Sequence, residues 1–245
     1  MKIGLPVAAV LLVVAEAYAA DPLAVQFDHP VAIRKVPPKS SDDPNGQITC
    51  TFYRDFMVRE SGTDTPDPND ATLVPIASAA RPSCDAAKHG GDVALKTQGF
   101  SFIGRKSNFL LFSVTDPNGA IPFMAIDAAD GHIIFQDGTS AEHGMQTVAV
   151  ENGSLHLRYT RGFNASCSIM QDAAGCWSRL VSEGKIPSNM AQPTPALKLC
   201  AAPYKAARSP ADNPSVISYP VDTVVDAAGH AQTTRRGPVA CSPMP

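Results

Sequence analysis

Residues 146–160 read QTVAVENGSLHLRYT and contain two short apolar runs on either side of Asn152-Gly153. In the second run Leu155, Leu157 and Tyr159 alternate with polar residues, which is the period of a half-buried strand. Asn-Gly favours the positive φ angles of a tight two-residue turn, so the stretch predicts a β-hairpin. We expect the three alternating side chains to face a core and the residues between them to face outward.

The same pattern recurs upstream of this hairpin. Four strand-like segments are FSFIG (100–104), FLLFSV (109–114), IPFMAID (121–127) and HIIFQ (132–136). The turn-forming sequences between or after them are Asp116-Pro117-Asn118-Gly119, Asp130-Gly131 and Asp137-Gly138. Strands spaced by about ten residues predict a mainly β fold: an antiparallel sandwich, barrel or propeller-like meander. The 22 prolines and 17 glycines favour many turns over long helices.

An earlier strand is expected at residues 47–58, QITCTFYRDFMV, which again alternate apolar and polar side chains. Arg54 interrupts the apolar row, so we place it at a sheet edge or at a β-bulge. A loop at 60–70, ESGTDTPDPND, separates this strand from the short strand LVPIA at 73–77. The antiparallel β core is therefore expected over residues 47–163.

One short helix is expected near residues 172–184. Its apolar stripe consists of Trp177, Leu180 and Val181. Asp172 is placed to cap its N-terminus and Gly184 to end it. A proline-rich linker at 187–196 follows.

The C-terminal region is expected to end in a hairpin. Its first strand is VISYPVDTVV (216–225), the turn is Asp226-Ala227-Ala228-Gly229, and the return strand ends near Val239 and Cys241. The helix and this hairpin together form the expected second part of the fold, residues 164–245, packed on the β core.

The N-terminus has the pattern of a secretory signal peptide at residues 1–19. Lys2 is followed by the apolar run LPVAAVLLVVA at 5–15, and Ala17-Tyr18-Ala19 supplies the small residues of a cleavage site. The alternative is a membrane anchor, but the run is shorter than the ~20 residues that a spanning helix needs. We expect cleavage after Ala19, a periplasmic or secreted protein of bacterial type, and no membrane span in the mature chain.

A lead-in and flexible connector is expected over residues 20–46. Residues 31–36 have the pattern of a short edge strand, and residues 37–46, PPKSSDDPNG, are polar and turn-rich.

The chain has six cysteines: Cys50, Cys84, Cys167, Cys176, Cys200 and Cys241. In an exported protein an even number indicates disulfides, although sequence alone allows fifteen connectivities. Local organisation favours sequential pairing, 50–84, 167–176 and 200–241. The alternative is redox or metal chemistry, but the chain has no CxxC pair, and the spacings fit no common zinc module. We therefore interpret the cysteines as structural.

Composition and motifs narrow the possible functions. Charged residues make up 18% of the chain and the formal net charge is −3, so nothing directs it to nucleic acid. The sequence has no HExxH and no GxSxG. The SxxK match at Ser182–Lys185 falls at the end of the expected helix, whereas SxxK enzymes need it at the start. We expect no catalytic, cofactor-binding or metal-binding residue, and no cofactor.

Two groups of carboxylates are possible cation ligands. The loop residues Asp64, Asp67, Asn69 and Asp70 lack the spacing of an EF-hand. Aspartates 116, 127, 130 and 137 could converge across hairpin ends, although aspartate in a turn is the ordinary case. The six histidines, His29, His89, His132, His143, His156 and His230, are interpreted as surface residues.

The function most compatible with these observations is a non-catalytic exported protein that binds an unknown protein or an envelope component. A hydrolase with an unrecognised site is the first alternative, because catalytic residues often come from distant parts of a chain. A periplasmic enzyme inhibitor acting through the 60–70 loop is the second. The sequence leaves enzymatic activity undecided.

Overall fold

The computed structural model describes residues 26–38, 46–62, 71–77, 81–86, 89–114, 119–141, 144–188, 190 and 196–245. Several expectations fall outside these residues: the signal peptide, most of the 37–46 connector, most of the 60–70 loop, the turn at 116–118, and His143.

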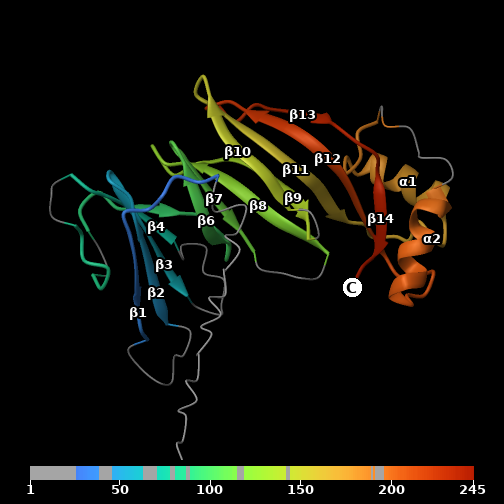
Figure 1. Ribbon diagram of the computed structural model, residues 1–245, viewed down its shortest axis with the longest axis horizontal. Coiled ribbons are helices and arrows are strands. Elements are labelled where there is room, and N and C mark those ends of the chain that lie inside the picture. Colours follow the sequence, from blue (N-terminus) through green and yellow to red (C-terminus); the bar gives the residue numbers. More distant parts are fainter. Residues whose placement is uncertain are drawn as a thin grey trace, which may run out of the picture.

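Two antiparallel sheets form most of the molecule (Figure 1). Sheet A has the order β1 (Ala32–Val36), β2 (Gln47–Phe52), β3 (Phe56–Gly62), β4 (Ala71–Pro75) and β5 (Val93–Leu95). The main path of sheet B runs β13 (Ala231–Arg235), β12 (Ser215–Val225), β11 (Ser154–Asn164), β9 (Ile133–Ser140), β8 (Ala120–Asp127), β7 (Phe109–Ser113) and β6 (Ser101–Lys106). Two further strands join it, β10 (Met145–Glu151) beside β11 and β14 (Ala240–Pro243) beside β12. The expected mainly β, antiparallel class is confirmed.

A closed barrel, one of the three expected architectures, is wrong. Among the described residues sheet A ends at β1 and β5, and the path of sheet B ends at β13 and β6. The edge strand expected at residues 31–36 is confirmed as β1, which pairs with β2.

The hairpin at Asn152-Gly153 is confirmed. β10 and β11 pair through it, with Glu151 opposite Ser154. Asn152 has φ +52° and Gly153 has φ +77°, so both turn residues adopt the left-handed conformation that Asn-Gly tolerates. Leu155, Leu157 and Tyr159 are all buried, as their alternation predicted.

The single strand expected at 47–58 is wrong, because the chain reverses in its middle. β2 ends at Phe52 and β3 begins at Phe56, with the Tyr53 N–H donating to the Phe56 carbonyl at 2.8 Å. Arg54 and Asp55 form the turn and are exposed, so Arg54 lies at neither an edge nor a bulge. The turn contains no Gly, Asn or Pro, and Asp55 is its one turn-favouring residue, so its sequence signal is weak.

The turn expected at Asp137-Gly138 is also wrong. Strand β9 continues through both residues to Ser140, and Gly138 pairs with Pro122 of β8. Here Gly138 meets a close neighbour: a Cβ added to it would lie 2.5 Å from the carbonyl oxygen of Gly162 on β11. Glycine at this position therefore allows β9 and β11 to approach each other closely.

The two sheets pack on each other through a shared core, which we call the inter-sheet core. It contains Tyr53, Phe56, Val58, Leu73 and Leu95 from the sheet A side and Leu110, Phe112, Met124 and Ile126 from sheet B. Arg105 of β6 also links the two sheets. Its guanidinium donates to both carboxylate oxygens of Asp55, in the β2–β3 turn of sheet A, at 2.5 and 2.8 Å. The guanidinium also lies over the Phe56 ring, 4.4 Å from its centroid.

The opposite face of sheet B carries a second core, which we call the helix-side core. On β7, Phe109 and Leu111 belong to it, whereas the alternate residues belong to the inter-sheet core. Phe27 is buried in this core. The residues on either side of Phe27 in the sequence bind two different strands. The Gln26 side chain accepts a hydrogen bond from the Val148 N–H of β10, and the Asp28 N–H donates to the Arg105 carbonyl of β6.

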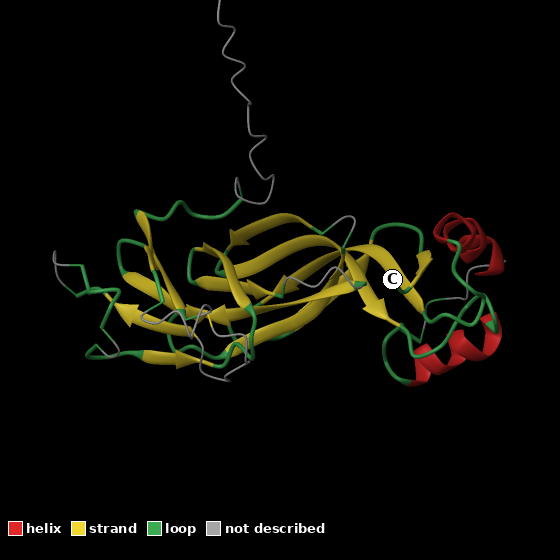
Figure 2. Cartoon of the chain, turned by 90° about the horizontal axis from the view of Figure 1, so that it is seen from below, coloured by secondary structure: helices red, strands yellow, loops and turns green. Residues whose placement is uncertain are grey.

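Helix α1 (Ala173–Ser182) covers part of the helix-side core. Its cap is confirmed, because the Asp172 side chain accepts from the Gly175 N–H at 2.9 Å. Trp177 and Leu180 are buried in the core, and the helix ends before Gly184. Figure 2 shows both helices at one end of the molecule. Of the described helices, none has the length and apolarity that a membrane crossing requires.

A second helix, α2 (Ala196–Ala207), corrects the expectation of one helix. Pro203 lies inside this helix. Because proline lacks the backbone N–H that an interior helical residue donates, its presence argues against a helix when the sequence is read alone. Tertiary contacts hold the segment instead. Cys200 and Tyr204, one turn apart, are buried, and the Tyr204 hydroxyl donates to the Asn213 carbonyl at 2.7 Å.

The C-terminal hairpin is present with a divided return strand. β13 pairs with Val221–Val225 of β12, and β14 pairs with Ser215–Ser218. Gly237 and Pro238 lie between these two pieces. Because β12 also pairs with β11 over ten residues, the hairpin is part of sheet B.

Candidate functional site

The six cysteines form three disulfides with the expected sequential pairing. Cys50 pairs with Cys84, Cys167 with Cys176, and Cys200 with Cys241, with Cα–Cα distances of 5.9, 5.6 and 4.9 Å. No cysteine is free. The first disulfide lies in a small core on sheet A, the second ties the lead-in of α1 to that helix, and the third joins α2 to β14. Thiol chemistry is therefore not available in this state.

The described histidines do not form a nucleophile–base arrangement. Three of them lie beside aspartates in or near turns: His89 with Asp92, His132 with Asp130, and His230 with Asp226. None of these histidine side chains hydrogen-bonds a serine or cysteine side chain in the part of the chain that the structure describes. Ser182, the SxxK serine, ends α1 and donates to the Arg179 carbonyl.

Two of the four aspartates that could converge do so. Ligand atoms of Asp127, Asp130 and His132 all lie within 4.8 Å of one another in the β8–β9 turn. Asp127 accepts from the Ala129 N–H at 2.8 Å and Asp130 from the His132 N–H at 3.1 Å, which are ordinary turn contacts. The exposed group therefore has a structural explanation. Asp137 lies elsewhere, and Asp116 and the 64–70 acidic loop lie outside the described residues.

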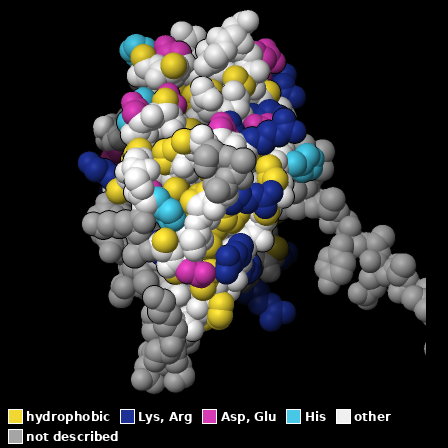
Figure 3. All heavy atoms as spheres, turned by 90° about the vertical axis from the view of Figure 1, so that its left-hand side faces the viewer, with side chains coloured by type: hydrophobic (Ala, Val, Ile, Leu, Met, Phe, Trp, Pro, Cys, Tyr) yellow, Lys and Arg dark blue, Asp and Glu magenta, His cyan; other side chains and the backbone are white. Residues whose placement is uncertain are grey.

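The described surface of sheet A carries exposed apolar and basic side chains. Figure 3 shows the end of the molecule that sheet A forms, where hydrophobic side chains lie among lysines and arginines. Val31 and Ile33, beside and within edge strand β1, are 48% and 60% exposed. Arg34 and Lys35 follow directly and are exposed as well. Charged residues on an edge strand usually prevent pairing with another chain.

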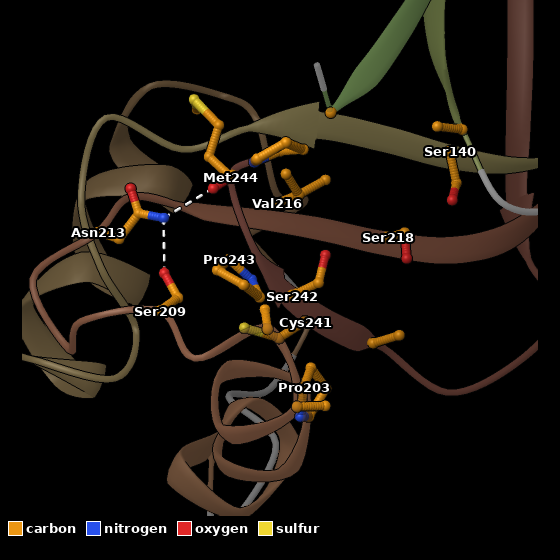
Figure 4. A pocket seen from close by; sticks show the side chains of 16 residues that line it. Ser140, Pro203, Ser209, Asn213, Val216, Ser218, Cys241, Ser242, Pro243 and Met244 are labelled. Carbon is orange, nitrogen blue, oxygen red and sulfur yellow. Dashed lines mark hydrogen bonds between the residues drawn. The ribbon is translucent and has the colours of Figure 1, made fainter. Parts of the chain in front are cut away.

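The first of two hollows, which we call the C-terminal cavity, has a volume of about 720 Å³. Figure 4 shows β9 and β12 residues such as Ser140 and Ser218 on one side of it and Pro203 of α2 on the other. Residues 240–245, which include β14, complete the lining. Its volume falls within the ~300–1,000 Å³ typical of small-molecule sites.

Covalent and hydrogen-bonded contacts hold these walls together. The Cys200–Cys241 disulfide fixes α2 to β14. The Asn213 side-chain amide donates to the Ser209 hydroxyl at 2.8 Å and to the Met244 carbonyl at 2.7 Å, which ties the α2–β12 loop to the C-terminal segment (Figure 4). The cavity is therefore preorganised.

The described side chains that line the C-terminal cavity are uncharged. None of the described side chains that line it belongs to Asp, Glu, Lys, Arg or His. Val216, Pro243 and Met244 supply apolar surface, and four serines supply hydroxyls. One of these serines, Ser140, is only 8% exposed, and its hydroxyl makes no hydrogen bond to any described residue. The described side chains of the cavity therefore offer apolar contacts, hydroxyl groups and one amide, without a charged side chain.

The second feature is a polar network between β9 and β11. The Asp137 carboxylate accepts from Arg161 Nε at 2.9 Å and from the Tyr159 hydroxyl. Arg161 Nη1 donates to the Tyr219 hydroxyl at 3.2 Å, and the Tyr159 hydroxyl lies 3.3 Å from that of Thr223. The Asp137 and Arg161 side chains are 10% and 27% exposed. This is a largely buried, hydrogen-bonded ion pair.

The network keeps the two tyrosines and the arginine protonated. Burial, together with the charge of Asp137 and the hydrogen bond to it, raises the pKa of the Tyr159 hydroxyl. Burial is also the main reason that the pKa of Tyr219 is raised. For Arg161, burial is the largest single influence and would lower the pKa, but the attraction to Asp137 and the tyrosines, together with the hydrogen bond to Asp137, outweighs burial and the pKa is raised. The two tyrosines therefore remain neutral and the guanidinium remains charged at ordinary pH.

Sequence reasoning missed both features. Asp137-Gly138 has the composition of a turn, and only the pairing of β9 shows otherwise. A usable signal exists on β11, where Arg161 continues the core-facing row Leu155, Leu157, Tyr159 and is followed by Phe163. An arginine in such a row indicates a buried carboxylate partner. Comparisons of the chain with protein-family models, curated proteins and solved structures find no match.

Proposed function

We propose that this chain is an exported, non-catalytic binding protein whose C-terminal cavity holds an uncharged, partly apolar molecule. The observation that carries the proposal is the lining of that cavity, which combines apolar side chains and serine hydroxyls with no charged side chain among its described residues. Transferring a charged group into such surroundings without a partner is costly, whereas a neutral molecule meets both kinds of contact.

The polar groups of the cavity support a ligand with a few hydrogen-bonding atoms. A hydroxyl that faces a cavity can donate a hydrogen bond to a ligand and accept one from it. The hydroxyls of Ser140, Ser218 and Ser242 line the cavity. An alcohol, amide or ester attached to an apolar body has the matching chemistry.

Export is supported by two independent features. Residues 1–19 have the composition of a signal peptide, and the three disulfides fit an oxidising compartment such as the periplasm or the extracellular space. N-terminal sequencing of the protein recovered from an exporting bacterium tests this part. We expect the mature chain to begin at Ala20. A chain that retains residues 1–19 would contradict it.

Binding is tested with two fluorescent probes that share one apolar body. N-phenyl-1-naphthylamine is neutral, whereas 8-anilinonaphthalene-1-sulfonate adds a sulfonate to the same rings. We expect the neutral probe to bind saturably in the C-terminal cavity and the sulfonate to bind there at least tenfold more weakly.

A matched pair of variants locates the probe. Ala206 lies on α2 and lines the cavity, whereas Ala201 is exposed on the same helix and does not line it. Ala206→Trp is expected to fill the cavity and abolish binding of the neutral probe, and Ala201→Trp to leave it unchanged. Equal binding to the two variants, or no binding to the unaltered protein, would contradict the proposal.

A further inference from the structure

The second hollow, which we call the Asp137 cleft, lies over the polar network and has a volume of about 650 Å³. Asp137, Arg161 and Lys185 line it together with Phe100, Pro122 and Phe163. The geometry points to a second binding site here, for a small molecule that joins a carboxylate to an apolar body. This site is independent of the C-terminal cavity, and its ligand differs in charge.

In the Asp137–Arg161 ion pair, the carboxylate uses more of its hydrogen-bonding capacity than the guanidinium does. Asp137 accepts hydrogen bonds from Arg161 Nε, from the Tyr159 hydroxyl and from the Gly138 N–H. The guanidinium has five N–H donors. Those at Nε and one at Nη1 are used, and no other hydrogen bond joins it to a described residue. The network therefore holds a cation with unused donors beside a carboxylate that already accepts several hydrogen bonds.

Arg161 is the more accessible member of the pair. Its side chain is 27% exposed, whereas that of Asp137 is 10% exposed. Both residues line the cleft. A guanidinium matches the geometry of a carboxylate because two parallel N–H groups can bind its two oxygens. An anionic group is therefore the ligand chemistry that Arg161 favours.

The other residues that line the Asp137 cleft supply further charges and apolar surface. Lys185 and Glu183 lie on either side of Gly184 after the end of α1, and both are exposed. Lys185 makes no ion pair with the described residues, so its ammonium is free to support an anion. Glu183 carries the opposite charge and favours a ligand that also bears an amine. Phe100, Phe163 and Pro122 supply apolar surface for the body of the ligand.

The arrangement is held rigidly. Arg161 and Asp137 are fixed by strands β11 and β9, whose backbones approach closely at Gly162 and Gly138. Tyr219, on β12, holds the guanidinium from a third strand. A site on paired strands, with its charged group oriented by several neighbours, binds with little loss of conformational freedom.

The experiment is an NMR titration of the isotope-labelled protein with three compounds that share a phenylpropyl skeleton. These are 3-phenylpropionate, its uncharged amide 3-phenylpropanamide, and phenylalanine. We expect 3-phenylpropionate to shift the backbone amide signals of Gly138, Gly162 and Gly184 saturably, and the amide to bind about tenfold more weakly. Tighter binding of phenylalanine than of 3-phenylpropionate would identify Glu183 as the partner of its amine, and weaker binding would identify a simple carboxylate as the ligand.

Two variants and one control make the test decisive. Lys185→Gln is on the surface and is expected to fold, and it should weaken 3-phenylpropionate binding about threefold to tenfold. Lys205→Gln, on the exposed side of α2, should leave binding unchanged. Arg161→Lys keeps the positive charge but removes the forked donors, and should weaken binding further. Its fold is checked by comparing its amide spectrum with that of the unaltered protein.

Three results would overturn the inference: equal binding of the acid and its amide, unchanged affinity in the Lys185 and Arg161 variants, or shifts confined to residues of the C-terminal cavity such as Ala207 and Ser242. The Ala206→Trp variant separates this site from the proposed function. It should bind 3-phenylpropionate normally while losing the neutral naphthylamine probe.

Discussion

Gly138 of β9 and Gly162 of β11 touch so closely that a Cβ on Gly162 would lie 2.8 Å from the backbone nitrogen of Ser140, and one on Gly138 2.5 Å from the Gly162 carbonyl oxygen. Asp137 precedes the first glycine and Arg161 precedes the second. The close approach of the two backbones therefore places the carboxylate and the guanidinium within hydrogen-bonding distance.

Gly138→Ala is expected to lower the free energy of unfolding by about 1–3 kcal/mol, because the added methyl meets backbone atoms that have little room to move. Gly90→Ala is the control, since a Cβ there has nothing within 4 Å. Chemical denaturation of both variants measures the difference. A Gly138→Ala protein as stable as the Gly90→Ala protein would show that β9 and β11 are not in contact here.

Removing one member of the Asp137–Arg161 pair should destabilise the fold strongly, because the other member stays buried without its partner. We expect Asp137→Asn and Arg161→Gln each to cost about 3 kcal/mol, the lower end of the range for buried pairs, since Arg161 is partly exposed. The double variant should cost less than the sum of the two, in a double-mutant cycle.

The exposed pair Arg34–Asp85 is the control for this cycle. Its side chains are 57% and 49% exposed, so Arg34→Gln should change stability by less than about 1 kcal/mol. If Arg34→Gln and Arg161→Gln had the same effect, the Asp137–Arg161 pair would not be buried as described.

Alkaline pH should destabilise the protein because several tyrosines are buried in their neutral form. Burial is the main cause that raises the pKa of Tyr53, to about 12, and it also raises the pKa values of Tyr159 and Tyr219. In the unfolded chain these groups ionise near 10. Their contribution is therefore fully present below pH 10 and is lost as the pH rises from 10 toward 12.

Urea denaturation at pH 8 and pH 11 measures this loss. Tyr53→Phe, which removes one of the ionising groups, should show a smaller difference between the two pH values than the unaltered protein. An identical difference in both proteins would mean that Tyr53 is not buried in the neutral form.

The Cys200–Cys241 disulfide should be required for the C-terminal cavity. A Cys200→Ser, Cys241→Ser variant loses the covalent link between α2 and β14, so it should be less stable by about 2–5 kcal/mol and bind the neutral naphthylamine probe much more weakly. The matched Cys50→Ser, Cys84→Ser variant loses a disulfide in sheet A. It should lose stability but retain probe binding wherever it remains folded.

All six cysteines are expected to be oxidised in the mature protein. Alkylation of the denatured chain without reductant should label no cysteine, and alkylation after reduction should label six. Labelling of two or more cysteines before reduction would contradict the three-disulfide pattern.

Local patterns were sufficient for much of the strand content. The alternation of Leu155, Leu157 and Tyr159 and the Asn-Gly turn before them are properties of adjacent residues, and the structure confirms both. Helix α1 is similar, because its cap and apolar stripe lie within one segment. Arg54-Asp55 escaped detection because a turn without Gly, Asn or Pro looks like part of a strand.

The functional features depend on contacts between distant residues. Asp137 meets Tyr159 and Arg161, which lie more than twenty residues away, and an Asp-Gly sequence carries no sign of such partners. Helix α2 likewise depends on Cys241, which is 41 residues from Cys200. The C-terminal cavity forms between this helix, β12 and the β8–β9 end of sheet B, and no single stretch of sequence contains it.

The sequence by itself determined the mainly β class, most of the strands and α1, because each depends on side-chain periodicity or turn chemistry within a short segment. It favoured a sequential disulfide pairing but left the connectivity open. Tertiary structure alone decided the division into two sheets, the course of β9 through Asp137-Gly138, and the positions of the two hollows. These features depend on which strands become neighbours, and that is set by the packing of the whole chain around its cores.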